Sequence, residues 1–407
     1  MNKILPLLLL VFSAGLFACG KNASDPTIIQ WRGIDRSGVF QETGLLTSWP
    51  DGGPELLWYF DGLGYGYASP VIANGRIFIN GMNGETAMGS IFVFDLNGNL
   101  LNQREYGQEW NRSFPGARGT IAPSNNKLYL LSGQGVVYCI DQNTLNVIWS
   151  RNLREEFNAP SFDFTESPLL VGNKVIVTPG GAQHNMIALN KNTGELIWST
   201  PGKGGRPTFC SAIFIDNYEV PLIVQMTGEY TLGIHADTGE LLWAYPNTRN
   251  EGHANSPFYS NGMILLTTGR GHGSFMLRLL DGGRSVEEVW TSTLPDNRHG
   301  GVVRIGNYFY TSGHNNRYWF CVNWYTGEIM WQESSNTSGV TIAADGMLYM
   351  YTARGDIKLV RPTPERFDIV SEFPITLGTA EHIAHPIIHN GVLYVRRGNT
   401  LMAYRIR

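Results

Sequence analysis

Short apolar runs alternate with polar, glycine-containing turns along most of this chain. In residues 188–198 an apolar run ends in a polar turn, and a second apolar run closes with tryptophan, a pattern typical of a β-hairpin. The same ending recurs at residues 239–243 and 327–331, and looser copies end at Trp149 and Trp290. A unit that recurs through the chain predicts a repeat architecture.

The complete repeat reads as four strands. An inner strand often opens at Ser-Pro, a tight turn and a second strand follow, and a glycine-rich loop leads to the third strand and the tryptophan-closed fourth. Copies begin near residues 68, 119, 167, 208, 256 and 301, a degenerate seventh turns at 345–346, and an eighth begins near 385. The tryptophans that close the repeats, Trp149, Trp198, Trp243, Trp290 and Trp331, are 49, 45, 47 and 41 residues apart, which fits four-stranded propeller blades.

The two ends of the chain predict how the ring closes. The eighth repeat stops at Arg407 after three strands, whereas residues 55–58 have the sequence of a fourth strand with no repeat of its own. An N-terminal strand that completes the last blade leaves the sheets few free edges. We therefore predict an all-β fold, a single eight-bladed β-propeller of antiparallel four-stranded blades over residues 29–407, with seven blades as the fallback.

The recurring tryptophans are predicted to be structural. A catalytic residue has no reason to recur in every blade, whereas an indole can pack between blades and donate its N–H. The predicted docking residues are Trp58, Trp149, Trp198, Trp243, Trp290 and Trp331.

The N-terminus has the pattern of an export signal. Lys3 precedes an apolar run at residues 4–12 that is too short to cross a bilayer. The following Leu-Phe-Ala-Cys-Gly resembles the lipobox of bacterial lipoproteins, which implies a signal peptide at 1–18, lipidation of Cys19 and a polar tether to residue 28. The protein is then expected in the bacterial cell envelope, facing the periplasm or at the outer membrane. The alternative is an ordinary signal peptide with a chance cysteine.

Charge and cysteine content narrow the possible partners. The chain has 30 basic and 34 acidic residues and no basic block, which argues against nucleic acid as a partner. Cys139, Cys210 and Cys321 lie far apart in apolar runs, and we predict buried free thiols.

Propeller topology also sorts the polar residues by face. The starts of the inner strands share one face with the loops between strands two and three; we call it the loop face, and the opposite side the turn face. Function generally lies on such variable loops. The candidate ligand-binding residues on the loop face are Tyr67, Trp110, Arg118, Glu166, Arg206, His253, Asn255, Arg298, His299, Glu381 and His382.

Three interpretations of this set remain open. The residues can simply satisfy polar loops at the mouth of the channel, or they can converge on a pocket for an anionic or sugar-like ligand. A metal or general-base site would use the histidines with Glu166 or Glu381. The histidines are scattered over several blades without a close H-x-H or H-x-x-x-H spacing, so no metal site is predicted.

The Thr-Gly-Glu-x-x-Trp endings resemble the tryptophan-docking repeats of the pyrroloquinoline quinone (PQQ)-like β-propellers, and residues 31–38 resemble a segment at the start of exported members. That family includes quinoprotein alcohol and sugar dehydrogenases, and also a cofactor-free lipoprotein of the outer-membrane assembly machinery. The resemblance therefore implies the fold more firmly than the function.

If the chain were a dehydrogenase of this family, the resemblance would imply PQQ with calcium, held by a tryptophan and a pair of adjacent cysteines. The sequence has no such pair and no C-x-x-C-H motif for covalent haem. Asp163 is the nearest match to the catalytic aspartate, and Trp110 is the tryptophan available for stacking. No cofactor is predicted, although PQQ with calcium stays open, and catalytic residues remain unassigned.

These observations favour a binding platform in the cell envelope whose loop face contacts a carbohydrate, a small anion or a protein. The first alternative is a PQQ-dependent oxidoreductase acting on sugars or alcohols. The second is a scaffold for the assembly of envelope proteins.

Overall fold

The computed structural model describes residues 30–33, 35–203, 205–247 and 253–407. The predicted signal peptide, Cys19 and the tether lie outside these residues, so they stay predictions. Within the described part of the chain, no helix is both long enough and apolar enough to cross a bilayer.

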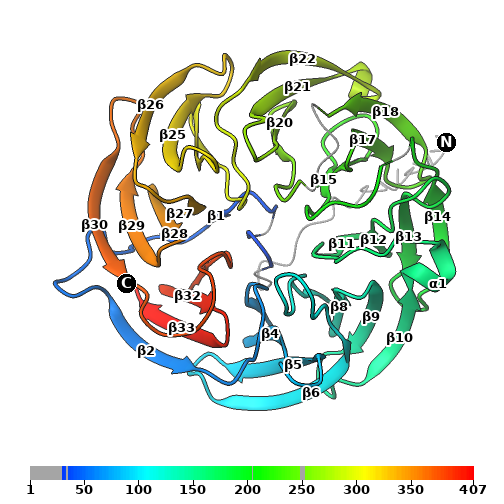
Figure 1. Cartoon of the computed structure of the whole chain (residues 1–407), viewed down its shortest axis with the longest axis horizontal. Helices are drawn as coiled ribbons and strands as arrows, with labels where there is room; N and C mark the ends of the chain where they lie inside the picture. The colour runs from blue at the N-terminus through cyan, green and yellow to red at the C-terminus, as the bar shows by residue number, and fades with distance from the viewer. Residues whose placement is uncertain (1–29, 34, 204, 248–252) are drawn as a thin grey trace, which may run out of the picture.

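Eight sheets surround a central axis, and each sheet forms one blade (Figure 1). Blade 1 contains β3 (Val71–Ala73), β4 (Arg76–Met82), β5 (Met88–Asp95) and β6 (Leu100–Gln108). Blade 2 contains β7 (Ala122–Ser124), β8 (Lys127–Leu131), β9 (Val136–Asp141) and β10 (Val147–Asn152). Blade 3 contains β11 (Leu169–Val171), β12 (Lys174–Val177), β13 (Met186–Asn190) and β14 (Leu196–Thr200). Blade 4 contains β15 (Ile213–Ile215), β16 (Leu222–Met226), β17 (Tyr230–His235) and β18 (Leu241–Pro246).

The second half of the ring repeats the pattern. Blade 5 contains β19 (Phe258–Ser260), β20 (Met263–Thr267), β21 (Ser274–Leu280) and β22 (Ser285–Ser292). Blade 6 contains β23 (Val303–Ile305), β24 (Tyr308–Ser312), β25 (Tyr318–Asn323) and β26 (Ile329–Ser334). Blade 7 contains β27 (Gly339–Ala344), β28 (Met347–Thr352), β29 (Asp356–Arg361) and β30 (Asp368–Pro374). Blade 8 contains β31 (Ile387–His389), β32 (Val392–Arg397), β33 (Thr400–Arg405) and β2 (Glu55–Phe60).

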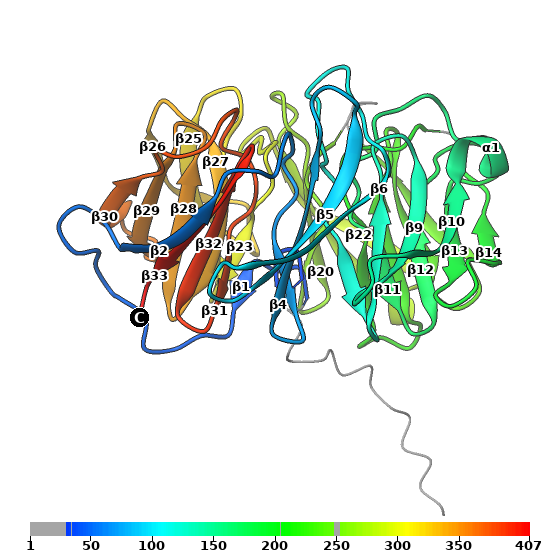
Figure 2. The same ribbon diagram turned by 90° about the horizontal axis from the view of Figure 1, so that it is seen from below.

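The N-terminal strand closes the ring as predicted. β2 pairs antiparallel with β33, with Trp58 opposite Ala403, and so supplies the outer strand of blade 8. The eight-bladed prediction is confirmed, and the seven-bladed fallback is not needed. A short helix, α1 (Leu153–Phe157), follows β10 on the loop face and was not predicted (Figure 2). Asn152 caps it by accepting from two backbone N–H groups.

The recurring tryptophans join neighbouring blades through hydrogen bonds. Each indole N–H donates to a backbone carbonyl in the next blade, at the polar turn before its outer strand. In chain order of the tryptophans, the acceptors are Leu96, Lys191, Ala236, Gly283, Trp324 and Thr363. The glycine of the turn leaves room for the ring: a Cβ on Gly194 would lie 2.8 Å from the Trp149 indole. The repeat motif is therefore a joint between blades.

The central strands of the blades are buried, and successive blades pack apolar side chains against each other. The three cysteines lie inside these strands or beside them as buried free thiols, as predicted. Burial raises the pKa of Cys210 to about 12, which keeps the thiol protonated and chemically inert at neutral pH.

The segment before β2 was not anticipated. Residues 30–33 and 35–40, the axial segment, enter the centre of the ring, where β1 (Val39–Phe40) pairs in parallel with β27 of blade 7 (Figures 1 and 2). The chain then follows the turn face, where Glu42 accepts from the backbone N–H groups of Asn390 and Gly391. Trp49 packs against Tyr349 and Phe373 before the chain reaches β2.

Candidate functional site

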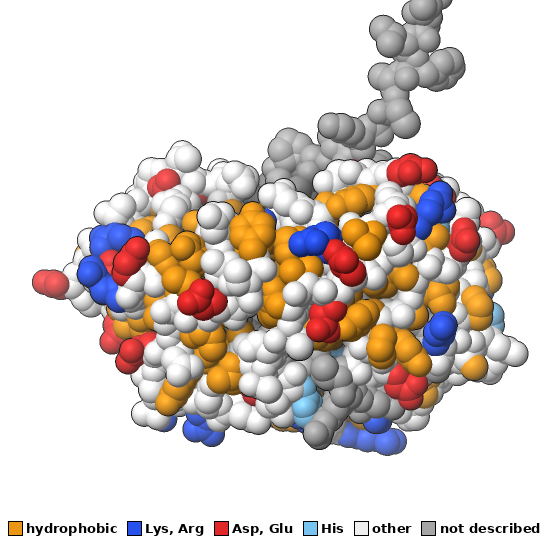
Figure 3. All heavy atoms as spheres, turned by 90° about the horizontal axis from the view of Figure 1, so that it is seen from above, with side chains coloured by type: hydrophobic (Ala, Val, Ile, Leu, Met, Phe, Trp, Pro, Cys, Tyr) orange, Lys and Arg blue, Asp and Glu red, His pale blue; other side chains and the backbone are white. Residues whose placement is uncertain are grey.

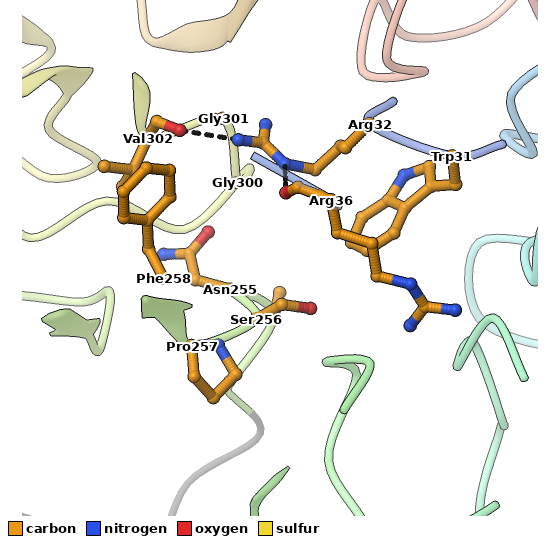
Figure 4. A pocket seen from close by; sticks show the side chains of 11 residues that line it. Trp31, Arg32, Arg36, Asn255, Ser256, Pro257, Phe258, Gly300, Gly301 and Val302 are labelled. Atoms are coloured by element: carbon orange, nitrogen blue, oxygen red, sulfur yellow. Dashed lines mark hydrogen bonds between the residues drawn. The ribbon is translucent and has the colours of Figure 1, made fainter. Parts of the chain in front are cut away.

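The centre of the ring is filled by three side chains of the axial segment: Trp31, Arg32 and Arg36 (Figure 4). Both arginines are buried, at 4% and 7% exposure. The Arg36 guanidinium lies over the Trp31 ring at 5.7 Å, and Trp31 meets the His385 ring edge-on at 5.6 Å. The central channel of the ring is therefore packed with side chains at this point.

Arg32 connects the axial segment to blades 6, 7 and 8. It donates to the carbonyl oxygens of Val302, at 2.5 Å, and Thr341, at 3.5 Å, and to Nδ1 of His385 at 3.3 Å. Nε2 of His385 lies 3.1 Å from the His299 carbonyl, so this nitrogen donates and Nδ1 accepts. Burial, helped by the adjacent Arg32, lowers the pKa of His385 to about 3. His385 is thus held as one neutral tautomer.

Arg36 connects the same segment to blades 3 and 4. Its guanidinium donates to the carbonyl oxygens of Ser167, Pro168 and Ala212, the last two at 2.8 Å. Burial lowers the pKa of Arg36 to about 10, so the side chain stays charged at neutral pH. We call the side chains of Trp31, Arg32 and Arg36 the axial plug. Its two arginines together connect it to five blades.

Little free volume remains beside the plug. The cavity bounded by the axial segment and by the inner strands of blades 5 and 6 has a volume of about 20 Å³. This is room for about one water molecule. Of the candidate residues, Asn255 is the one that lines it.

At the starts of the inner strands, side-chain hydroxyl groups form a series of hydrogen bonds between successive blades, which we call the hydroxyl relay. It was not predicted from the sequence. The backbone N–H at this position in each of four blades donates to the side-chain hydroxyl at the same position in the next blade, at 2.9–3.1 Å. The relay runs through Ser69, Thr120, Ser167, Ser211 and Ser256. The Ser or Thr that recurs at this position of the repeat is the sequence feature from which the relay could have been predicted. The relay connects blades 1 to 5 around the axis.

Tyr67, Arg118 and Glu381 are the predicted residues that the structure brings together. The Tyr67 hydroxyl donates to Glu381 at 2.8 Å, and burial together with this carboxylate raises the pKa of Tyr67 above its usual range. Arg118 forms an ion pair with Asp163 at 2.9 Å. Asp163, the nearest match to a catalytic aspartate, is thus engaged in a charge pair between adjacent blades.

Other candidates are tied to their own neighbours. Glu166 is buried and accepts from the backbone N–H and the hydroxyl of Thr178. Burial raises the pKa of Glu166 to about 8, so it is largely protonated at neutral pH. Asn255 donates to the Thr267 hydroxyl and to the Asn297 carbonyl. These bonds stabilise the strand ends and leave few groups directed at a common ligand.

The candidate histidines are separated in the same way. His299 lies 3.0 Å from the Ser338 hydroxyl, and His382 lies 2.7 Å from the Tyr351 hydroxyl. Burial lowers the pKa of both rings to about 4, so both are neutral at neutral pH. The His253 carbonyl accepts from the Phe209 N–H at 2.8 Å. The described residues contain no cluster of three or more histidine, cysteine, aspartate or glutamate side chains suited to a metal ion.

The last three candidates occupy the loops. Arg206 is exposed, and Arg298 is half-buried. Trp110 is buried at 9% exposure, with the Arg112 guanidinium 5.4 Å from its ring. Its faces are therefore covered rather than presented to a cofactor.

The described residues do not fit PQQ with calcium. A quinone ring system needs an aromatic platform, open volume on the scale of a small-molecule pocket, and metal-binding oxygens. The axis offers a cavity of about 20 Å³ beside two buried cationic side chains. We therefore derive no reaction step through a quinone.

Comparison with known proteins agrees with this architecture. A family model described as "Outer membrane protein assembly factor BamB" matches residues 87–333, more than half of the chain. The chain belongs to this family of PQQ-like β-propellers. No curated protein matches it.

Solved structures of several functions share the fold. BamB from Moraxella catarrhalis superposes with a TM-score of 0.64 at 10% identity, covering 86% of this chain and 99% of that one. Quinohemoprotein alcohol dehydrogenase from Comamonas testosteroni gives 0.66 at 13% identity, covering 93% and 80%. A europium-containing methanol dehydrogenase gives 0.64 at 14% identity, covering 92% and 90%. At these identities the likeness concerns the fold alone.

Proposed function

We propose that this protein is a scaffold that binds protein partners through its loop face in the cell envelope. The observation that carries the proposal is the filled axis, because the plug of Trp31, Arg32 and Arg36 leaves a cavity of only about 20 Å³. With the axis filled by these described residues, the outer surface is the place where a partner can bind. Membership in the family described as an outer membrane protein assembly factor supports a protein partner over a carbohydrate.

Exposed aromatic side chains mark one place on that face. Tyr65 is 48% exposed and Phe114 is 56% exposed, and both lie in loop-face connections beside blade 1. These connections touch each other, since Gly66 and Ala117 form a parallel bridge. Exposed aromatic residues near arginines, here Arg112 and Arg118, are typical of binding hot spots.

The test compares partner recovery by two double variants. Tyr65→Ser with Phe114→Ser removes the loop-face aromatics, whereas Leu100→Ser with Leu101→Ser removes comparably exposed side chains from the rim of the same blade. We expect the loop-face variant to lose a partner that the wild type and the rim variant recover from envelope extracts. Equal recovery by all three proteins argues against loop-face docking. Substrate-dependent dye reduction after reconstitution with PQQ and calcium would contradict the scaffold proposal outright.

The proposed location rests on the N-terminal pattern. We infer export and lipidation at Cys19 from the apolar run at residues 4–12 and the lipobox-like sequence that follows it. The measurement is the partition of the full chain into a detergent phase, with Cys19→Ser as the comparison. Equal partition of the two proteins would refute lipid anchoring at this residue.

A further inference from the structure

Three loop-face loops of blades 5 and 6 are joined by one buried carboxylate. They are the connection between β20 and β21 (residues 268–273), the connection between β22 and β23 (293–302) and the connection between β24 and β25 (313–317). Asp296, in the second loop, is fully buried. It accepts from the backbone N–H groups of Gly271 at 2.7 Å, His314 at 2.8 Å and Asn315 at 3.1 Å. The Gly269 N–H also donates to the Asn297 carbonyl at 3.0 Å. The three loops thus form one unit.

Each loop brings one arginine and one histidine to this unit. We call the arginines, Arg270, Arg298 and Arg317, the arginine triad; the histidines are His272, His299 and His314. The His299 and His314 rings meet edge-on at 5.8 Å, so the second and third loops also touch through these side chains. From the sequence we predict His299 on this face, but not that the loops are joined.

The charge of the unit is positive. Burial lowers the pKa of His314, and the guanidiniums of Arg298, Arg270 and Arg317 each lower it further. All three arginines therefore act on the same imidazole. Asp296 is the one acidic side chain in the three loops, so the arginine and carboxylate charges of the loops sum to +2. Arg270 and Arg317 are exposed, and Arg298 is half-buried. Figure 3 shows basic and histidine side chains along its lower edge.

We propose that the arginine triad binds a carboxylate-rich segment of a protein partner. Guanidinium groups pair with carboxylates through two parallel hydrogen bonds. Three arginines on separate loops match successive acidic side chains better than one compact anion. The loops are held in place by the buried Asp296, so little ordering is needed on binding. The inference rests on the proposed scaffold function but concerns blades 5 and 6, away from Tyr65 and Phe114.

The test measures binding of a fluorescent oligoglutamate peptide of about ten residues by anisotropy at low salt. The triple variant Arg270→Ala, Arg298→Ala, Arg317→Ala should bind about tenfold more weakly, because it loses three surface ion pairs with the peptide. The matched control is Arg284→Ala, an exposed arginine on the turn face of blade 5, which should bind like the wild type. Added salt should weaken wild-type binding more than binding by the triple variant. Thermal unfolding confirms that each variant is folded.

Three outcomes would overturn the proposal. The first is equal affinity of the wild type and the triple variant, and the second is an equal loss in the Arg284→Ala control. The third is competition by polygalacturonate at lower concentrations of carboxylate than by oligoglutamate, which would indicate an acidic carbohydrate ligand. Failure here leaves the scaffold proposal standing if the Tyr65 and Phe114 variant still loses its partner. If the triple arginine variant binds the peptide like the wild type and the Tyr65 and Phe114 variant also keeps its partner, the scaffold proposal is refuted as well.

Discussion

Gly194→Ala tests the joint between blades quantitatively. Gly194 has φ +73°, and an added Cβ would lie 2.8 Å from the Trp149 ring. A non-glycine residue in the left-handed region costs about 1–2 kcal/mol. The methyl group also forces the indole to move, and overpacking of this kind costs about 1–3 kcal/mol. The shift strains the bond from Trp149 Nε1 to the Lys191 carbonyl, 3.1 Å long. We expect Gly194→Ala to destabilise the protein by about 2–5 kcal/mol in total.

Gly346→Ala separates the cost of the backbone conformation from the cost of overpacking against the indole. Gly346 has nearly the same backbone angle, φ +72°, but an added Cβ would meet no atom within 4 Å. It should therefore show the backbone cost alone, about 1–2 kcal/mol. The assay is urea unfolding followed by tryptophan fluorescence and circular dichroism, comparing the midpoints of the three proteins. If Gly194→Ala and Gly346→Ala lose the same stability, the tryptophan does not constrain the turn and the reasoning is refuted.

Three further predictions concern the axial plug and the buried acid. Arg36→Met should lower stability by about 2–4 kcal/mol, because three buried carbonyl oxygens lose a charged donor, whereas Arg284→Met should have little effect; unfolding midpoints measure both. Arg36→Met should also speed hydrogen exchange at residues 31–40, and unchanged exchange would contradict the role of the plug. Burial raises the pKa of Glu166 to about 8, above its unfolded value, so the folded state retains a proton that the unfolded state loses as pH rises. Between pH 6.5 and 8 the stability of the wild type relative to Glu166→Gln should accordingly fall, since the histidines titrate alike in both proteins; identical slopes would contradict this assignment.

The ring could be predicted from the sequence because its signals are periodic. The spacing of Trp149, Trp198, Trp243, Trp290 and Trp331 sets the length of each blade. The strand around Trp58 completed the eighth blade, because the C-terminal repeat has three strands and needs a fourth. The looser copy that ends at Trp149 keeps the turn of the repeat, because Leu145 adopts φ +57° in the position that glycine occupies elsewhere.

The axial segment could not be predicted, because it occurs once and has no period. Residues 31–38 were singled out for their resemblance to other exported propellers, but their partners are backbone carbonyls that leave no mark on the sequence. The candidate residues could be assigned to the loop face for the same topological reason as the blades. Its internal pairing, such as Tyr67 with Glu381, depends on contacts between residues 314 positions apart. Asp296 was missed because its partners are backbone N–H groups.

Site-specific photo-crosslinking tests the central claim, that the loop face is the surface that docks a protein partner. A photoreactive amino acid would replace Tyr65, Phe114 or Arg206 on the loop face and, in parallel, Asn97, Asn192 or Asp237, exposed residues on the turn face. Irradiation of the full chain in intact cells should give a discrete crosslinked protein from the loop-face positions and none from the turn-face positions. Crosslinks from the turn face alone, or equally from both faces, would contradict the account.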